Sequence, residues 1–133
     1  MLPCCERKLE HNSNRETNKK AYDIEGNTAF NNIVNYREPC FRSNDLKRLD
    51  LDRAYHNENA EWRKYYSATL VVPIRYLSEP DNKHKCYGFL SIDSLNQIRS
   101  LGLFNGDECM FILEHAADLL AMHFLSLELK RKP

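Results

Sequence analysis

The sequence has no excess of charge of either sign. Lysine and arginine number 19, aspartate and glutamate also number 19, and the formal net charge at pH 7 is therefore zero. Proteins that bind nucleic acid usually concentrate positive charge on one face. The even balance argues against a nucleic-acid partner.

The sequence also lacks paired cysteines. Its five cysteines are an odd number, and no two of them stand in a CxxC spacing. A disulfide framework or a zinc knuckle would require paired spacings, so the pattern favours neither and indicates a reducing compartment. We therefore expect a cytoplasmic protein with structural cysteines. They are Cys4, Cys5, Cys40, Cys86 and Cys109.

Long hydrophobic runs are missing as well. The first ten residues contain no apolar stretch of the length found in signal peptides. The most apolar region, 111–129, is interrupted by Glu114, Asp118, His123 and Glu128. A membrane span needs roughly 18 apolar residues in succession, so we expect no membrane partner.

The motifs of the common enzyme and metal classes are absent from the sequence. It contains no GxSxG, P-loop, GxGxxG or HExxH pattern. His115 and His123 would lie roughly 12 Å apart along a helix, too far to share one metal ion. Asp45 and Asp93 could act as acid or base, but capping roles explain both more simply. We predict that the protein is not an enzyme, has no metal site, and has a cofactor status that the sequence leaves unknown.

Residues 66–93 contain the clearest strand pattern. The segment 66–76 is rich in β-branched and aromatic residues, the segment 77–85 has turn composition, and 86–93 returns as a second strand. These features predict an antiparallel hairpin with a long loop. On the first strand, Leu70, Val72 and Ile74 alternate onto one face.

Three further expectations concern side-chain positions in this hairpin. Pro73 cannot donate to a ladder, so it should lie on an unpaired side or near a strand end. Gly88 should mark a bulge or a close approach. Strict alternation places Tyr87 and Phe89 on one face of the return strand, and Leu90 and Ile92 on the other.

Two segments before the hairpin have weaker secondary-structure patterns. Residues 43–52 predict a short helix, with Ser43 and Asn44 as N-caps and Leu46 and Leu49 on one side. Residues 27–34 fit either a short strand or a helical turn.

A long helix is predicted at 107–130, with Asn105 and Glu108 at capping-box spacing. One apolar stripe of this helix should pack on the sheet. A second stripe should be covered by another part of this chain or by a second copy, which gives a homodimer through helix 107–130 as one hypothesis. The first stripe comprises Leu113, Ala116, Ala117, Leu120, Phe124 and Leu127, and the second comprises Phe111, Leu119, Met122, Leu125 and Leu129.

Four segments in order resemble motifs of bacterial GAF domains. They are 41–46 (FRSNDL), 62–75 with its closing VVPIR, 87–94 (YGFLSIDS) and 117–120 (ADLL), and the similarity covers roughly 27–128. The resemblance implies an α+β fold of GAF/PAS type, in which an antiparallel sheet has flanking helices. It also implies a sensory or regulatory role in signal transduction, with a small-molecule ligand between the sheet and the short connecting helices.

The sequence departs from this family in several places. The first helix and strand of the family find no match in residues 1–26, so we expect a flexible or N-terminally incomplete segment there and a GAF-like domain at 27–130. The motif of the cyclic-nucleotide-binding subset is absent. No cysteine is marked as a bilin attachment site. The resemblance therefore names no ligand.

Aromatic residues gather between the short helix and the first strand of the hairpin. We predict that a ligand site in this region is lined by residues from both elements, since aromatic side chains with a few polar groups commonly line pockets. The alternative is that the aromatic residues form core beneath the short helices, and that the module is structural and serves homodimerisation or protein interaction. Arg75 could meet an anionic ligand or could end the strand in solvent. The candidate lining residues are Phe41, Leu46, Tyr55, Trp62, Tyr66, Thr69 and Arg75.

Overall fold

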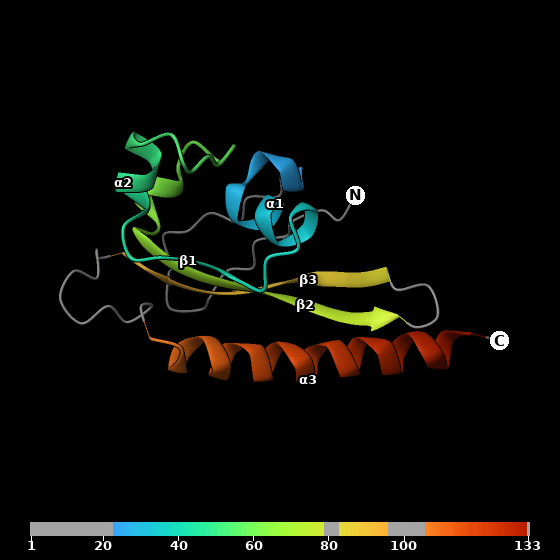
Figure 1. Cartoon of the computed structure of the whole chain (residues 1–133). Coiled ribbons are helices and arrows are strands. Elements are labelled where there is room, and N and C mark those ends of the chain that lie inside the picture. The colour runs from blue at the N-terminus through green and yellow to red at the C-terminus, as the bar shows by residue number, and fades with distance from the viewer. Residues whose placement is uncertain (1–22, 79–82, 96–105, 133) are drawn as a thin grey trace.

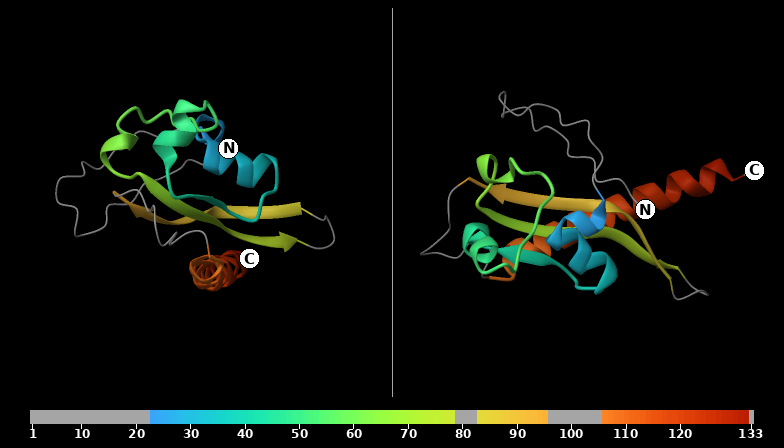
Figure 2. Two further views of the ribbon diagram at one scale, coloured as in Figure 1. Left: turned by 60° about the vertical axis from the view of Figure 1, so that its left-hand side comes forward. Right: turned by 90° about the horizontal axis from the view of Figure 1, so that it is seen from above.

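An antiparallel sheet separates two layers of helices. The computed structural model describes residues 23–78, 83–95 and 106–132. Figure 1 shows α1 (Thr28–Asn35) and α2 (Leu46–Leu51) on one face of the sheet and α3 (Glu108–Arg131) along the other. The left view of Figure 2 looks nearly along α3 and shows the same layering. The predicted class, an α+β fold whose antiparallel sheet has flanking helices, is confirmed.

The sheet has the strand order β1-β2-β3, with β1 at Phe41–Ser43, β2 at Ala68–Ser78 and β3 at Lys83–Ser94. Both pairings are antiparallel. The predicted hairpin is confirmed, although β2 lies two residues further along the chain than the expected 66–76 and β3 is longer than the expected 86–93. Both strands extend into the segment 77–85. Two 3-10 helices complete the described elements, η1 at Ile24–Gly26 and η2 at Trp62–Lys64.

Strict alternation on β2 builds the main core, as predicted. Leu70, Val72 and Ile74 are buried on the face that carries α3, where they pack with Leu113 and Ala117. The opposite face of β2 turns Val71 toward α1, where it packs with Ala29 and Ile33. Because β2 is the central strand and is covered on both faces, its apolar residues form an almost continuous run.

The predicted faces of β3 are wrong on one point. Tyr87 packs on the α3 side, whereas Phe89 stacks on Phe30 of α1 with ring centroids 4.3 Å apart. The register explains the difference, since Ile74 pairs with Gly88 and Arg75 pairs with Cys86, so Tyr87 is the extra residue of a β-bulge. Gly88 has φ of 155°, a backbone conformation that side chains rarely adopt, and the bulge expected at this glycine is confirmed.

Pro73 lies in the middle of β2 and pairs in register with Phe89. The ladder between β1 and β2 ends at Val71. Beyond that residue, the described structure places no strand on the β1 side of β2. This arrangement agrees with the expectation that Pro73 lies beside an unpaired edge.

The two short helices begin at side-chain caps. Asn27 Oδ1 accepts from the Ala29 amide at 2.9 Å, so the segment that fitted either a strand or a helical turn is the helix α1. In α2 the cap is Asp45, whose Oδ1 accepts from the Arg48 amide at 3.1 Å, which confirms the capping role expected for this residue; Ser43 and Asn44, also expected as N-caps, are not at the N-cap position. Asn105, the expected cap of α3, lies outside the described residues.

Helix α2 ends in a Schellman motif that contains an arginine where glycine is usual. The amide of Arg53 donates to Asp50 O at 3.0 Å and that of Ala54 donates to Leu49 O at 2.8 Å, and Arg53 has φ of 58°. We expect Arg53→Gly to raise the free energy of unfolding by about 1 kcal/mol, because glycine carries no steric penalty at positive φ. Urea denaturation measures the change.

The matched control is Lys47→Gly, at an exposed position inside the same helix. That substitution should lower the free energy of unfolding by about 1 kcal/mol. Equal losses at both positions would contradict the strain assigned to Arg53.

Helix α3 alone, among the helices of the described residues, is long and apolar enough to cross a membrane by length and composition. This differs from the expectation that no segment approaches such a span. The finding is weak evidence, because core helices of soluble proteins pass the same test. Here one side of α3 packs on β2 through Leu113, Ala117 and Ala121.

Candidate functional site

Five of the seven predicted lining residues lie together on the α1 and α2 side of the sheet. This aromatic cluster comprises Phe41, Leu46, Tyr55, Trp62 and Tyr66. Its ring centroids follow one another at 5.9 Å, 5.1 Å and 5.8 Å, from Phe41 through Tyr55 and Trp62 to Tyr66. Leu46 is 0% and Trp62 2% exposed, and these side chains pack against one another in one buried cluster.

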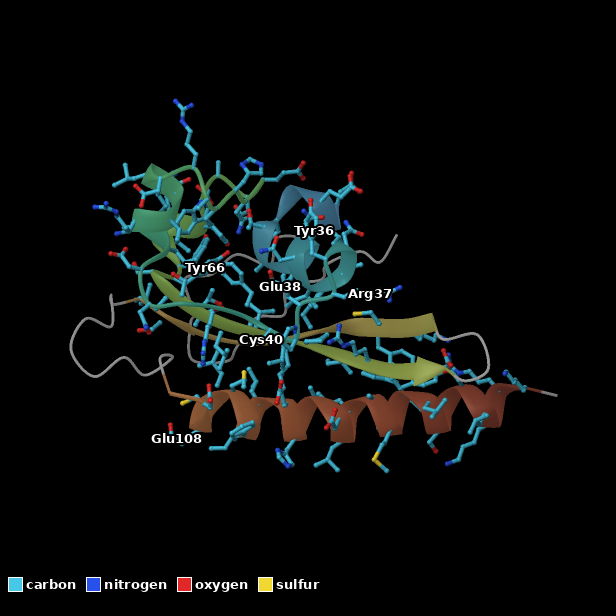
Figure 3. The ribbon with its side chains drawn as sticks, viewed as in Figure 1. Tyr36, Arg37, Glu38, Cys40, Tyr66 and Glu108 are labelled. Carbon is cyan, nitrogen blue, oxygen red and sulfur yellow. The ribbon has the colours of Figure 1, made fainter. Side chains whose placement is uncertain are left out.

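Local hydrogen bonds hold the cluster against the sheet. The amide of Leu46, the first residue of α2, donates to Ser67 O at 2.8 Å, one residue before β2 begins. The amides of Tyr65 and Tyr66 both donate to Trp62 O, at 3.0 Å and 3.2 Å, so η2 turns the chain tightly beside the cluster. In Figure 3, Tyr66 lies on the α2 side of the sheet, while Glu108 lies at the first turn of α3 on the other side.

One polar side chain, Asn57, bridges the two tyrosine hydroxyls of the cluster. Its Nδ2 donates to the Tyr66 hydroxyl at 2.7 Å and to the Tyr55 hydroxyl at 3.2 Å. Its Oδ1 accepts from the Asn59 amide at 2.9 Å, which fixes the orientation of the amide group. Burial raises the pKa of Tyr55, while its hydrogen bonds act in the opposite direction. Sequence reasoning did not find Asn57, since no motif marks a lone asparagine in a loop.

The remaining two predicted residues, Thr69 and Arg75, lie on β2. The Thr69 hydroxyl donates to Asp93 Oδ1 at 2.6 Å across the hairpin. Arg75 is six residues further along β2, about 20 Å away at the rise of a strand. Arg75 therefore does not share a site with Thr69 and the aromatic cluster.

The described residues contain no group of three or more His, Cys, Asp or Glu side chains that could hold a metal ion. Asp45 caps α2, and Asp93 accepts the hydrogen bond from Thr69. The capping role expected for Asp45 is thus confirmed, and Asp93 links β3 to β2 through Thr69.

A second candidate site is the face of α3 that points away from the sheet. Four large apolar side chains on it are strongly exposed, with Ile112 at 70%, Leu119 at 68%, Met122 at 68% and Leu129 at 60%. Together with two exposed polar residues they recur at alternating spacings of three and four. We call this set the α3 seam. It comprises Ile112, His115, Leu119, Met122, Ser126 and Leu129.

The seam has the spacing by which two helices pack along each other. It spans 112–129, roughly 26 Å of helix. An open hollow on its C-terminal half is lined by Met122, Leu125, Ser126, Leu129 and Lys130. Exposure of Leu119, Met122 and Leu129 was expected from the sequence, whereas Ile112 and the regular spacing were not noticed there.

Contacts at both ends hold α3 on the sheet and so fix the direction in which the seam points. At its start, Arg42 of β1 forms an ion pair with Asp107 at 3.0 Å, and Cys40 Sγ lies 3.3 Å from Met110 Sδ. Burial raises the pKa of the Cys40 thiol, which favours its protonated form.

At the other end, Glu128 joins α3 to the hairpin. Its carboxylate pairs with Lys85 and accepts a hydrogen bond from the Tyr87 hydroxyl at 3.1 Å. The hydrogen bond from Lys85 lowers the pKa of Glu128. The Tyr87 ring also packs on Phe124, with centroids 5.4 Å apart. These partners are about 40 residues apart in sequence, so no local pattern could have predicted them.

Comparisons of the chain with protein-family models, with curated proteins and with solved structures found no match. The resemblance to GAF domains consequently depends on the four sequence motifs, and the structure adds only the sheet with helices on both faces.

Proposed function

We propose that this chain is a non-catalytic regulatory module of GAF/PAS type that acts by pairing with a second copy through the α3 seam. The observation that carries the proposal is the row of exposed apolar side chains at heptad spacing. Exposed apolar surface of this extent on a soluble protein usually marks an interface. The antiparallel sheet flanked by helices is compatible with the GAF/PAS class.

A second copy is the occupant that the charges of α3 favour. Acidic residues lie at the start of the helix (the N-cap Asp107 and Glu108) and basic residues at its end (Lys130, Arg131 and the C-cap Lys132). Another α3 therefore offers charges complementary to both ends. Self-association also needs no further partner, and the most common form is a two-fold dimer.

Small-molecule sensing at the aromatic cluster is the second candidate. The observation in its favour is the amide of Asn57 beside two tyrosine hydroxyls in apolar surroundings, a combination typical of ligand sites. The packing of Leu46 and Trp62 argues against it, because a ligand would have to displace buried side chains. A screen of nucleotides and metabolites by thermal shift tests it, since a ligand at 100 times its Kd stabilises by about 2.7 kcal/mol.

Sedimentation velocity of the wild-type chain at rising concentration tests pairing. We expect the weight-average mass to rise from that of the monomer toward that of the dimer. A chain that stays monomeric at several hundred micromolar, roughly the upper limit for a weak specific interface, would contradict the proposed function. We expect a cytoplasmic location, as the cysteine pattern indicates.

A further inference from the structure

We infer that the two copies of α3 pair antiparallel, so that the polar residues of the seam, His115 and Ser126, meet each other across the interface. The inference depends on the proposed function, because it specifies how the same surface pairs. The antiparallel orientation determines which residue of the partner faces each seam position.

The sequence positions of the seam are symmetric about its centre. In an antiparallel pair with the two-fold axis between Leu119 and Met122, these two residues face each other across the axis. Ile112 then faces the partner's Leu129, so apolar residues meet apolar residues along the seam. The two polar positions, His115 and Ser126, likewise face each other, twice in each dimer. No apolar side chain is placed against a polar one.

The hydrogen bonding of His115 suits this arrangement. Its Nδ1 lies 2.6 Å from Phe111 O in the preceding turn, and a carbonyl oxygen only accepts, so Nδ1 carries the proton. In the neutral ring, Nε2 is then an acceptor. A serine hydroxyl across the interface can donate to it. In a parallel pair His115 would face the partner's His115, and two acceptors would meet without a donor.

The charges at the ends of α3 favour the same orientation. An antiparallel pair places Glu108 near the partner's Lys130 and Lys132. A parallel pair places like charges beside each other at both ends. The interaction between the two helix dipoles is also favourable only in the antiparallel arrangement, in which the dipoles point in opposite directions. Exposed ion pairs contribute little to affinity, but like-charge contacts select against the wrong orientation.

A charge exchange across the seam tests the orientation. Ile112→Glu and Leu129→Lys, each alone, should weaken the dimer at least roughly 100-fold in Kd, because each leaves a charge against an apolar partner. The double variant Ile112→Glu/Leu129→Lys should recover a Kd within about tenfold of the wild type, since the new charges pair in the antiparallel dimer. Sedimentation velocity measures all three.

The control is Ile112→Glu/Met122→Lys, which carries the same charges at positions that do not face each other in the antiparallel dimer. It should stay monomeric. Circular dichroism checks folding, which exposed positions 112, 122 and 129 should leave intact. A wild-type dimer whose 112/129 double variant remains monomeric would overturn the antiparallel orientation alone. A wild type that never dimerises, or single variants that dimerise normally, would overturn the proposed interface itself.

Discussion

Leu119→Glu should convert the dimer into monomers that remain folded. Leu119 lies at the centre of the seam and is 68% exposed in the single chain, so a carboxylate there meets water in the monomer. In the dimer the same carboxylate would be buried against apolar side chains of the partner without a hydrogen-bond donor. We expect Kd to rise at least roughly 100-fold, because burying an unpaired charge costs several kcal/mol.

The matched control is Leu51→Glu, which makes the same change at a 78% exposed leucine of α2 on the opposite side of the sheet. Sedimentation velocity should show dimers for Leu51→Glu and monomers for Leu119→Glu. At concentrations low enough for both variants to be monomeric, their free energies of unfolding should be equal. Should Leu119→Glu unfold the chain, the seam would be internal core covered by another part of this chain, and the dimer hypothesis would be wrong.

Elements with a strong local pattern could be predicted from the sequence. The strand predicted at 66–76 is observed two residues further along, at Ala68–Ser78. Leu113 and Ala117 of the predicted stripe of α3 lie in the core, but Ala121, which neither predicted stripe contained, is buried beside them and Phe124 is 37% exposed. The rest agrees because burial on one face imposes a period that the sequence displays. Alternation failed at Tyr87, since the bulge before Gly88 shifts the register of everything on its far side. A register shift depends on how a strand pairs with its partner, so it cannot be predicted from the sequence of one strand alone.

In the candidate sites, too, residues with a local sequence pattern could be predicted and residues without one could not. The aromatic residues at 41–66 could be grouped in advance because a short helix and a strand bring neighbouring segments together. Arg75 was wrongly assigned to the site because the length of the strand was not considered. Six residues of strand separate it from Thr69 and place it far from the cluster. Asn57 and the pairing of Lys85 with Glu128 were missed because exposed or loop polar residues have no periodic signal.

Trp62→Ala should cause a large loss of stability. The indole is 2% exposed and packs against Tyr55 and Tyr66, with centroids 5.1 Å and 5.8 Å away. Its removal loses the burial of the largest side chain and leaves a cavity that neighbouring rings cannot fill. We expect a loss of about 3–5 kcal/mol, a large share of the roughly 5–15 kcal/mol typical of a domain.

Urea denaturation of Trp62→Ala and of Tyr36→Ala measures this loss against a matched control, because Tyr36 is an aromatic residue that is 71% exposed. Tyr36→Ala should change the free energy of unfolding by less than about 0.5 kcal/mol. If the two variants lose similar amounts, the aromatic cluster is not core, and the space it occupies becomes open to a ligand. A large loss confined to Trp62→Ala favours packing as the role of the cluster, and with it an interaction module whose active surface is the α3 seam.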